Sequence, residues 1–222
     1  MAEKYGEIPP KFTKAWWSYF WMYYKWYVIG VAAVVIAVVG TAVQCAGREK
    51  YDLILNYCVT SMLDTEKEDA LEQELEKYTA DADGNGEVNV FLQQMNFGNT
   101  AGTEEMDYAL QVKHDVELSN DYSFLFIYDK DDAEMMVQRD SSGSVYMDTR
   151  EWLPEGMEDR AVISSTDDVP CAVSLAGSAV LEGLGIPSED LYIAVRLNYS
   201  DEEYNAVSQN SAIEAARALL AE

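Results

Sequence analysis

The stretch Trp26–Val43, WYVIGVAAVVIAVVGTAV, holds 18 residues without a charged side chain. Lys25 precedes it, and Arg48 is the next charged residue after it. In water, a helix that is apolar on every side would expose all of that surface. In a bilayer, a helix of this length satisfies its own backbone hydrogen bonds and is long enough to span. We therefore expect a single transmembrane helix over residues 26–46 and one soluble domain over residues 47–222.

An aromatic-rich segment precedes this run. Nine of the twelve residues in 16–27, WWSYFWMYYKWY, are aromatic, and Trp and Tyr rings favour the headgroup region of a membrane. Residues 1–25 are therefore expected to form a cytoplasmic and interfacial segment that extends the membrane helix. A partner-binding aromatic face is the alternative. The residues at helical spacing along one face are Trp16, Phe20, Tyr23 and Tyr27.

A cleaved signal peptide and a lipidated cysteine compete with this interpretation. A signal peptide has a short basic segment and a short apolar core, whereas 25 residues come before the apolar run here, so we expect the segment to be retained. Cys45 follows the apolar run, but Gln44 stands where a lipoprotein signal has a small residue. We expect Cys45 to be a small apolar residue near the outer end of the span.

Charge sets the expected orientation and partners. Four lysines lie on the N-terminal side of the run, against Arg48 and Lys50 nearby on the other side, which favours a cytoplasmic N terminus. Residues 51–222 hold 37 acidic and 9 basic side chains, a net charge of −28. This balance excludes nucleic acid as a partner, because phosphate binding needs a basic surface. We expect a cell-membrane protein whose acidic domain is extracellular; the charge either keeps the domain soluble or binds a cation or basic ligand.

Strand-like and helix-like segments alternate along the soluble domain. The expected strands are 51–59, 88–92, 122–128, 161–164, 171–175 and 191–197. Helices are expected after capping sequences at Thr65 and Ser200 and over 104–118, 131–138 and 178–184. Residues 139–160 look irregular, with a Ser-Ser-Gly turn at 141–143. The order predicts an α/β fold: a three-layer α/β sandwich with a mixed, mostly parallel sheet. Its expected central strands are 51–59, 88–92, 122–128 and 191–197.

The layout resembles a known group of membrane proteins. The segments that carry the resemblance are YYKWYVIG at 23–30, YDLILNYC at 51–58, the DGNG turn at 83–86, YSFLFIY at 122–128 and LYIAVRLN at 191–198. They are similar to the small single-pass membrane proteins of clostridia and related Firmicutes, whose outer domain is similar to part of an extracellular solute-binding protein. The resemblance implies a single solute-binding-like lobe, since a full solute-binding protein has two lobes and is nearly twice this long.

The segment DADGNGE, from Asp81 to Glu87, matches the front half of a calcium loop. Oxygen-bearing side chains alternate, and a glycine stands at the sharp turn. Leu92 occupies the twelfth position, where such a loop has a bidentate Glu. We expect no required cofactor and at most weak Ca²⁺ binding; a plain turn between a helix and a strand is the alternative. The expected metal ligands are Asp81, Asp83, Asn85 and Glu87.

The remaining candidate residues do not suggest catalysis. His114 is the only histidine, and its neighbours Lys113 and Asp115 indicate a helix surface. A disulfide between Cys58 and Cys171 stays open. The pairs Asp131-Asp132 and Asp167-Asp168 are expected to cap helices or line loops, and no serine or threonine has a base at a recognisable spacing. We therefore expect a protein that is not an enzyme.

Two classes of function fit these observations. The first is a membrane-anchored extracytoplasmic binding or interaction module, which presents the loops at the carboxyl ends of its strands to a protein, peptide or small solute. The second is an accessory or regulatory subunit of a larger membrane complex, which acts through the aromatic transmembrane segment. The ligand-binding residues expected for the first class are Thr60, Ser61, Asn96, Asp129 and Ser165.

Overall fold

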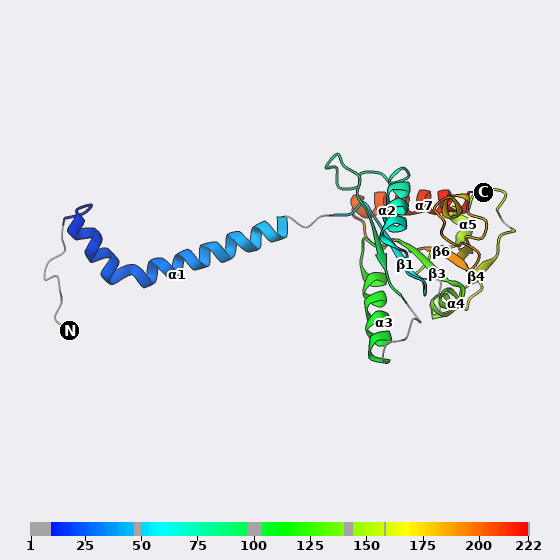
Figure 1. Cartoon of the computed structure of the whole chain (residues 1–222), viewed down its shortest axis with the longest axis horizontal. Coiled ribbons are helices and arrows are strands. Elements are labelled where there is room, and N and C mark those ends of the chain that lie inside the picture. The colour runs from blue at the N-terminus through cyan, green and yellow to red at the C-terminus, as the bar shows by residue number, and fades with distance from the viewer. Residues whose placement is uncertain (1–9, 47–49, 97–103, 140–143, 158, 222) are drawn as a thin grey trace. The chain divides into compact units, whose positions relative to one another are not determined.

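The computed structural model describes residues 10–46, 50–96, 104–139, 144–157 and 159–221 (Figure 1). The side chain of Cys45 and the turn expected at 141–143 lie outside the described part. The chain divides into two compact units, Met1–Glu49 and Lys50–Glu222.

In its described part, the first unit contains one helix, α1, which runs from Lys14 to Ala46 (Figure 1). The hydroxyl of Thr13 accepts the N–H of Trp16 at 3.2 Å and caps its start. Among the described residues α1 is the one candidate membrane span, over Lys14–Thr41. Its 33 residues extend about 50 Å, about 20 Å more than the hydrocarbon core of a bilayer. The aromatic segment and the apolar run therefore form one continuous helix.

The second unit is built on a six-stranded open sheet in the order β2-β1-β3-β6-β5-β4. Strand β1 pairs in parallel with β2 and β3, whereas β6 runs antiparallel to β3 and β5, and β4 runs antiparallel to β5. The strands are β1 (Leu53–Cys58), β2 (Val90–Gln94), β3 (Leu125–Asp129), β4 (Val162–Ser164), β5 (Pro170–Ser174) and β6 (Leu191–Val195).

This sheet confirms the α/β class and the mixed sheet but not all of the predicted order. Three of the five pairings are antiparallel: β6 runs antiparallel to both β3 and β5, and β4 runs antiparallel to β5. The expectation of a mostly parallel sheet is therefore wrong. Strand β2, expected to be central, lies at one edge, and β5 lies inside the sheet instead.

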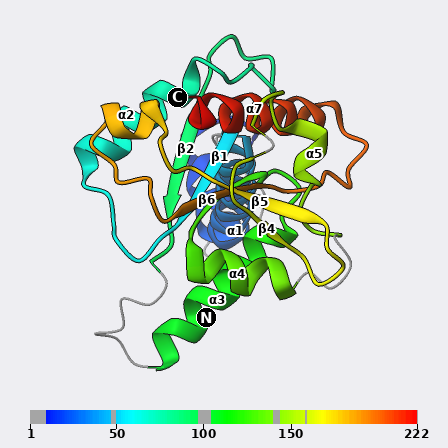
Figure 2. The same cartoon turned by 90° about the vertical axis from the view of Figure 1, so that its right-hand side faces the viewer.

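Two clusters of buried side chains lie against the sheet. Leu125 and Ile127 of β3 belong to the first cluster, and Phe126 and Tyr128 belong to the second, so alternate side chains of this strand are buried on opposite faces. In Figure 2, α7 lies above the strands, and α3 and α4 lie below them. The first cluster takes side chains from α2 (Thr65–Glu76), α5 (Thr149–Trp152), α6 (Ala179–Gly183) and α7 (Glu203–Leu220). The second takes side chains from α3 (Glu104–Ser119) and α4 (Lys130–Arg139).

Two local expectations are corrected by capping interactions. The short helix α5 lies within the segment expected to be irregular, because the side chain of Asp148 accepts the N–H of Arg150 at 2.9 Å and caps its start. Helix α2 is capped by Asp64 rather than Thr65, since the Asp64 carboxylate accepts the N–H of Lys67 at 2.9 Å. The second correction is a short-range choice between neighbouring capping residues.

Helix α7 packs on the sheet through small residues, which gives a test of its placement. Ala216 is fully buried, whereas Ala206 is exposed on the same helix. We expect Ala216→Leu to lower the free energy of unfolding by about 1–3 kcal/mol, because the site is filled. Ala206→Leu should change it by less than about 0.5 kcal/mol. Urea unfolding of both variants checks this, and equal effects would contradict the packing.

Candidate functional site

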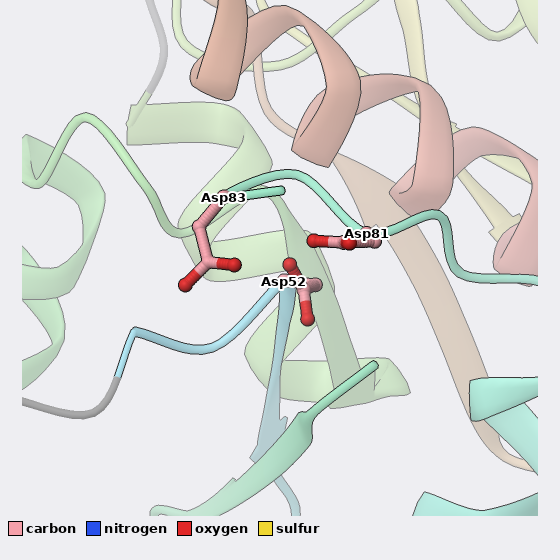
Figure 3. Close-up of side chains that lie close together, drawn as sticks. All are labelled: Asp52, Asp81 and Asp83. Carbon is pink, nitrogen blue, oxygen red and sulfur yellow. The ribbon is translucent and has the colours of Figure 1, made fainter. Parts of the chain in front are cut away.

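Three carboxylates meet beside the start of β1. Asp81 and Asp83 lie in the loop between α2 and β2, and Asp52 directly precedes β1 (Figure 3). One carboxylate oxygen from each lies within 4.8 Å of the others. Asp52 was not among the expected ligands, because it is distant in sequence from the loop.

The carboxylate of Asp81 organises the loop. It accepts the backbone N–H groups of Gly84 at 2.7 Å, Asn85 at 3.2 Å and Gly86 at 2.8 Å. Gly84 and Gly86 have φ angles of 72° and 89°, a region that glycine adopts without strain, and this lets three N–H groups reach one carboxylate. These bonds, the one from Gly86 foremost, lower the pKa of Asp81, because they favour the ionised carboxylate.

The other expected ligands serve partly as hydrogen-bond partners inside the loop. Asp83 accepts the backbone N–H of Asn85 and its side-chain amide, both at 3.0 Å. The side-chain oxygen of Asn85 accepts the N–H of Glu87 at 2.7 Å. Glu87 is not a member of the carboxylate group. Of the four expected metal ligands, the structure places Asp81 and Asp83 together and adds Asp52.

Asp52 ties both ends of the loop to the sheet. Its two carboxylate oxygens accept the N–H of Ala82 at 2.7 Å and the N–H of Asn89 at 2.8 Å, and the residue is buried. Because Ca²⁺ binds oxygen at about 2.3–2.6 Å, two ligands on opposite sides of the ion lie about 5 Å apart. The spacing of the three carboxylates is compatible with an ion of this size, and calcium binding stays a prediction.

Calcium gives a direct test of this group. We expect about 5 mM CaCl₂ to stabilise the full chain in detergent micelles by about 1 kcal/mol, if the dissociation constant is about 1 mM. Asp83→Asn keeps an acceptor for the N–H of Asn85 but removes a charge, so it should reduce the thermal shift by more than half. Asp167→Asn, an exposed position in the β4–β5 turn, should preserve it. No thermal shift in the wild type, or the same shift in Asp83→Asn, would contradict calcium binding by this group. The loop would then be a structural turn.

The second candidate site is the edge of the sheet where β1, β2 and β3 end. Thr60 and Ser61 follow β1, Asn96 follows β2, and Asp129 ends β3. The parallel registers bring these ends to the same edge, where open α/β sheets bind ligands. The backbone N–H of Thr60 donates to Oδ2 of Asp129 at 2.6 Å. Four of the five expected ligand-binding residues therefore lie at this carboxyl edge.

Ser165 lies at the opposite edge, so its expected place beside the other four is wrong. Strand β4 runs antiparallel to β5, and its last residue, Ser164, pairs with Pro170 at the start of β5. The hydroxyl of Ser165 accepts the N–H of Val169 at 3.3 Å, and its N–H donates to the Val169 carbonyl at 2.8 Å. Ser165 is a buried residue that closes the β4–β5 turn.

Asp132, in the first turn of α4, adds a second carboxylate to the carboxyl edge. Burial raises its pKa to about 6, and repulsion from Asp129 and Asp131 contributes. Burial, followed by the charge of Asp129, also raises the pKa of Tyr57 on β1 to about 12. Negative charge is therefore crowded at this edge, and a cation or a basic ligand group placed there would relieve the repulsion.

The raised pKa of Asp132 sets the sign of a pH-dependent effect. The folded chain holds this proton more tightly than the unfolded chain, whose carboxyl has a pKa of 3.8. The ionised group therefore destabilises the fold above about pH 6, and this cost disappears as the pH falls toward 4. Because the group is partly exposed, we expect Asp132→Asn to stabilise the fold by only about 1 kcal/mol at pH 7.5 and by almost nothing at pH 4. Urea unfolding at both pH values checks this, and an equal effect at both would contradict the assignment.

The thiols of Cys58 and Cys171 are both buried, and the thiol of Cys171 donates to the carbonyl of Val169 at 3.2 Å. Strands β3 and β6 lie between β1, which carries Cys58, and β5, which carries Cys171. This separation leaves no disulfide between them, because a disulfide needs Cα atoms within about 7 Å.

Comparisons with known proteins provide no relative for this chain: no family model, curated protein or solved structure matches it. The expected likeness to solute-binding lobes therefore rests on the sequence layout.

Proposed function

We propose that this chain is a membrane-anchored interaction module of the cell membrane, with a cytoplasmic N terminus and an extracellular acidic domain. The domain would be a three-layer α/β sandwich similar to a single solute-binding lobe, and it would act by recognition rather than catalysis. Three features support this proposal. Helix α1 is long and apolar enough to span a bilayer, the α/β unit is compact by itself, and lysines are more numerous before the apolar run than just after it.

The carboxyl edge of β1–β3 is the proposed recognition surface. The observation that carries it is the meeting of two carboxylates at this edge: Asp129, which accepts the N–H of Thr60 at 2.6 Å, and the partly buried Asp132, whose pKa is raised to about 6 by burial and by the charge of Asp129. A lysine or arginine of a partner would pair with both carboxylates and favour their ionised forms. Thr60 and Ser61 are exposed at the same edge and offer hydroxyl groups to a polar backbone. A basic peptide or protein segment is therefore the favoured ligand over an uncharged small solute.

A basic peptide tests the proposed surface. The probe is a short amidated peptide with two adjacent lysines, added to the full chain in micelles, and its control replaces both lysines by glutamine. We expect the lysine peptide to raise the thermal midpoint of the wild type at pH 7.5 and to lose this effect in Asp129→Asn/Asp132→Asn. The double variant Asp167→Asn/Asp168→Asn removes two charges from the exposed turn at the opposite edge and should keep the effect. Equal losses in both double variants, or no effect in the wild type, would contradict the proposal.

The alternative function, an accessory subunit of a membrane complex, is favoured by the surface of α1. An open hollow of about 540 Å³ runs along one face of this helix. Aromatic rings at one end of it stack at centroid distances of 5.4 Å for Trp16 and Phe20 and 5.5 Å for Phe20 and Tyr24. A helix of another subunit could fill this hollow. Its lining is Phe20, Tyr24, Tyr27, Val28, Val31, Ala32, Val35 and Ile36.

Replacing the aromatic face by leucine separates the two functions. The substitutions keep the helix apolar but remove the ring surface, so an interaction module should still bind the lysine peptide. An accessory subunit should instead lose its high-molecular-mass complex on a native gel of solubilised membranes. A complex that persists in this variant would contradict the accessory role. The replaced residues are Trp16, Phe20, Tyr24 and Tyr27, which form the stacked rings and the aromatic end of the hollow.

A further inference from the structure

A chain of three buried polar groups joins α3 to the sheet. His114 of α3 was expected at the surface, but its side chain is fully buried. Its Nε2 lies 2.8 Å from the hydroxyl of Tyr128 on β3, and that hydroxyl lies 2.8 Å from the hydroxyl of Tyr146. The three side chains are at most 1% exposed within an apolar cluster that includes Phe126. Such a chain stabilises the fold only while each of its buried polar groups has a hydrogen-bond partner.

His114 is central to the face by which α3 contacts the sheet. Leu110 and Leu118 lie one turn before and one turn after it, and both are partly buried against the same cluster. Among residues 108–119 of this helix, His114 alone is buried. Tyr108, with 70% of its surface exposed, and Val116, with 51%, point away from the sheet. The docking of α3 on the sheet therefore depends on the free energy of burying the imidazole.

The charges near the imidazole come from α3 and α4. Nδ1 of His114 lies 3.6 Å from a carboxylate oxygen of Asp115, whose other oxygen lies 3.8 Å from the guanidinium of Arg139 on α4. Burial lowers the pKa of His114; Asp115 and Glu117 oppose this shift, and Arg139 adds to it. The other titratable groups at this interface are Tyr128 and Tyr146, with Cys58 of β1 and Asp132 of α4 facing Tyr128.

We propose that His114 makes the docking of α3 sensitive to pH: the helix stays on the sheet while the imidazole is neutral and separates when it is protonated. A buried imidazolium would lose its hydration, and Asp115, a half-exposed group already near Arg139, would compensate for this loss only in part, with a smaller contribution from Glu117. Docking is complete above about pH 6.5, the ordinary value for histidine. It weakens as the pH falls below that value, because the undocked form takes up the proton more readily.

Separation of α3 would uncover the apolar layer beneath it, including the thiol of Cys58. This thiol is fully buried, and burial raises its pKa; Asp132 of α4, and then Lys113 and Glu117 of α3, also act on it. Its reactivity therefore reports on the position of α3.

The test uses the full chain in detergent micelles. Because His114 is the only histidine, its ring protons give one unambiguous NMR titration. The rate at which Cys58 reacts with a disulfide reagent that works in acid is measured in a Cys45→Ser/Cys171→Ala background. The protection of Cys58 is the rate for urea-unfolded protein divided by the rate for folded protein at the same pH. We expect His114 to titrate below pH 6.5. The protection of Cys58 should fall at least tenfold between pH 7.5 and pH 5, along the same curve.

His114→Gln is the matched variant, because glutamine keeps a polar partner for Tyr128 but does not titrate in this range. We expect its Cys58 protection to stay constant between pH 7.5 and pH 5. Equal pH dependence in both proteins would overturn the proposal and assign the effect to carboxylates. A histidine titration at or above pH 6.5, or protection that does not change in the wild type, would also overturn it. If the variant is unprotected at every pH, the wild-type titration and its coincidence with the loss of protection decide the question.

Discussion

The long apolar surface of α1 is the constraint on which the proposed role of the molecule depends. None of the apolar window of α1 is buried among the described residues, and Ile36, for example, is 71% exposed. Burying apolar surface is worth about 25 cal/mol per Å², so a helix of this size in water would associate with any apolar surface available. A bilayer removes that cost. In the arrangement that we propose, the acidic α/β unit would be the part that meets partners in water, and its charge would favour basic ones.

The strands were predictable from local sequence, but the direction in which they run was not. The apolar runs that contain β3 and β6 mark buried strands wherever they lie in a sheet. Whether the next strand returns parallel or antiparallel depends on how the connecting segment packs, and the apolar pattern of a strand does not record this. The misplacement of Ser165 is the direct consequence, because the carboxyl end of an antiparallel strand lies at the opposite edge. Thr60 and Asp129, in contrast, end neighbouring parallel strands and meet as expected.

In the candidate sites, too, residues that are close in sequence were predictable, whereas residues brought together by strand pairing were not. Asp81 and Asp83 were found through spacing within one loop, whereas Asp52 joins them only because β1 and β2 pair. The burial of His114 did have a local signal, since Leu110, His114 and Leu118 repeat every four residues. That signal was outweighed by the charged neighbours of His114, which point away from the sheet while the histidine points toward it. The position of a residue in the apolar repeat of an amphipathic helix is thus a better indicator of its burial than the polarity of its neighbours.

Labelling of introduced cysteines in intact cells tests the membrane-anchored arrangement most directly. In a Cys45→Ser background, Cys58 and Cys171 are buried, so a membrane-impermeant maleimide reports on an added thiol. Thr166, exposed in the β4–β5 turn, and Lys11, exposed before α1, provide one position in each unit. The proposed arrangement predicts that Thr166→Cys reacts in intact cells and that Lys11→Cys reacts only after lysis. Reaction of Thr166→Cys only after lysis, or of both positions before it, would contradict an extracellular domain anchored by a single span.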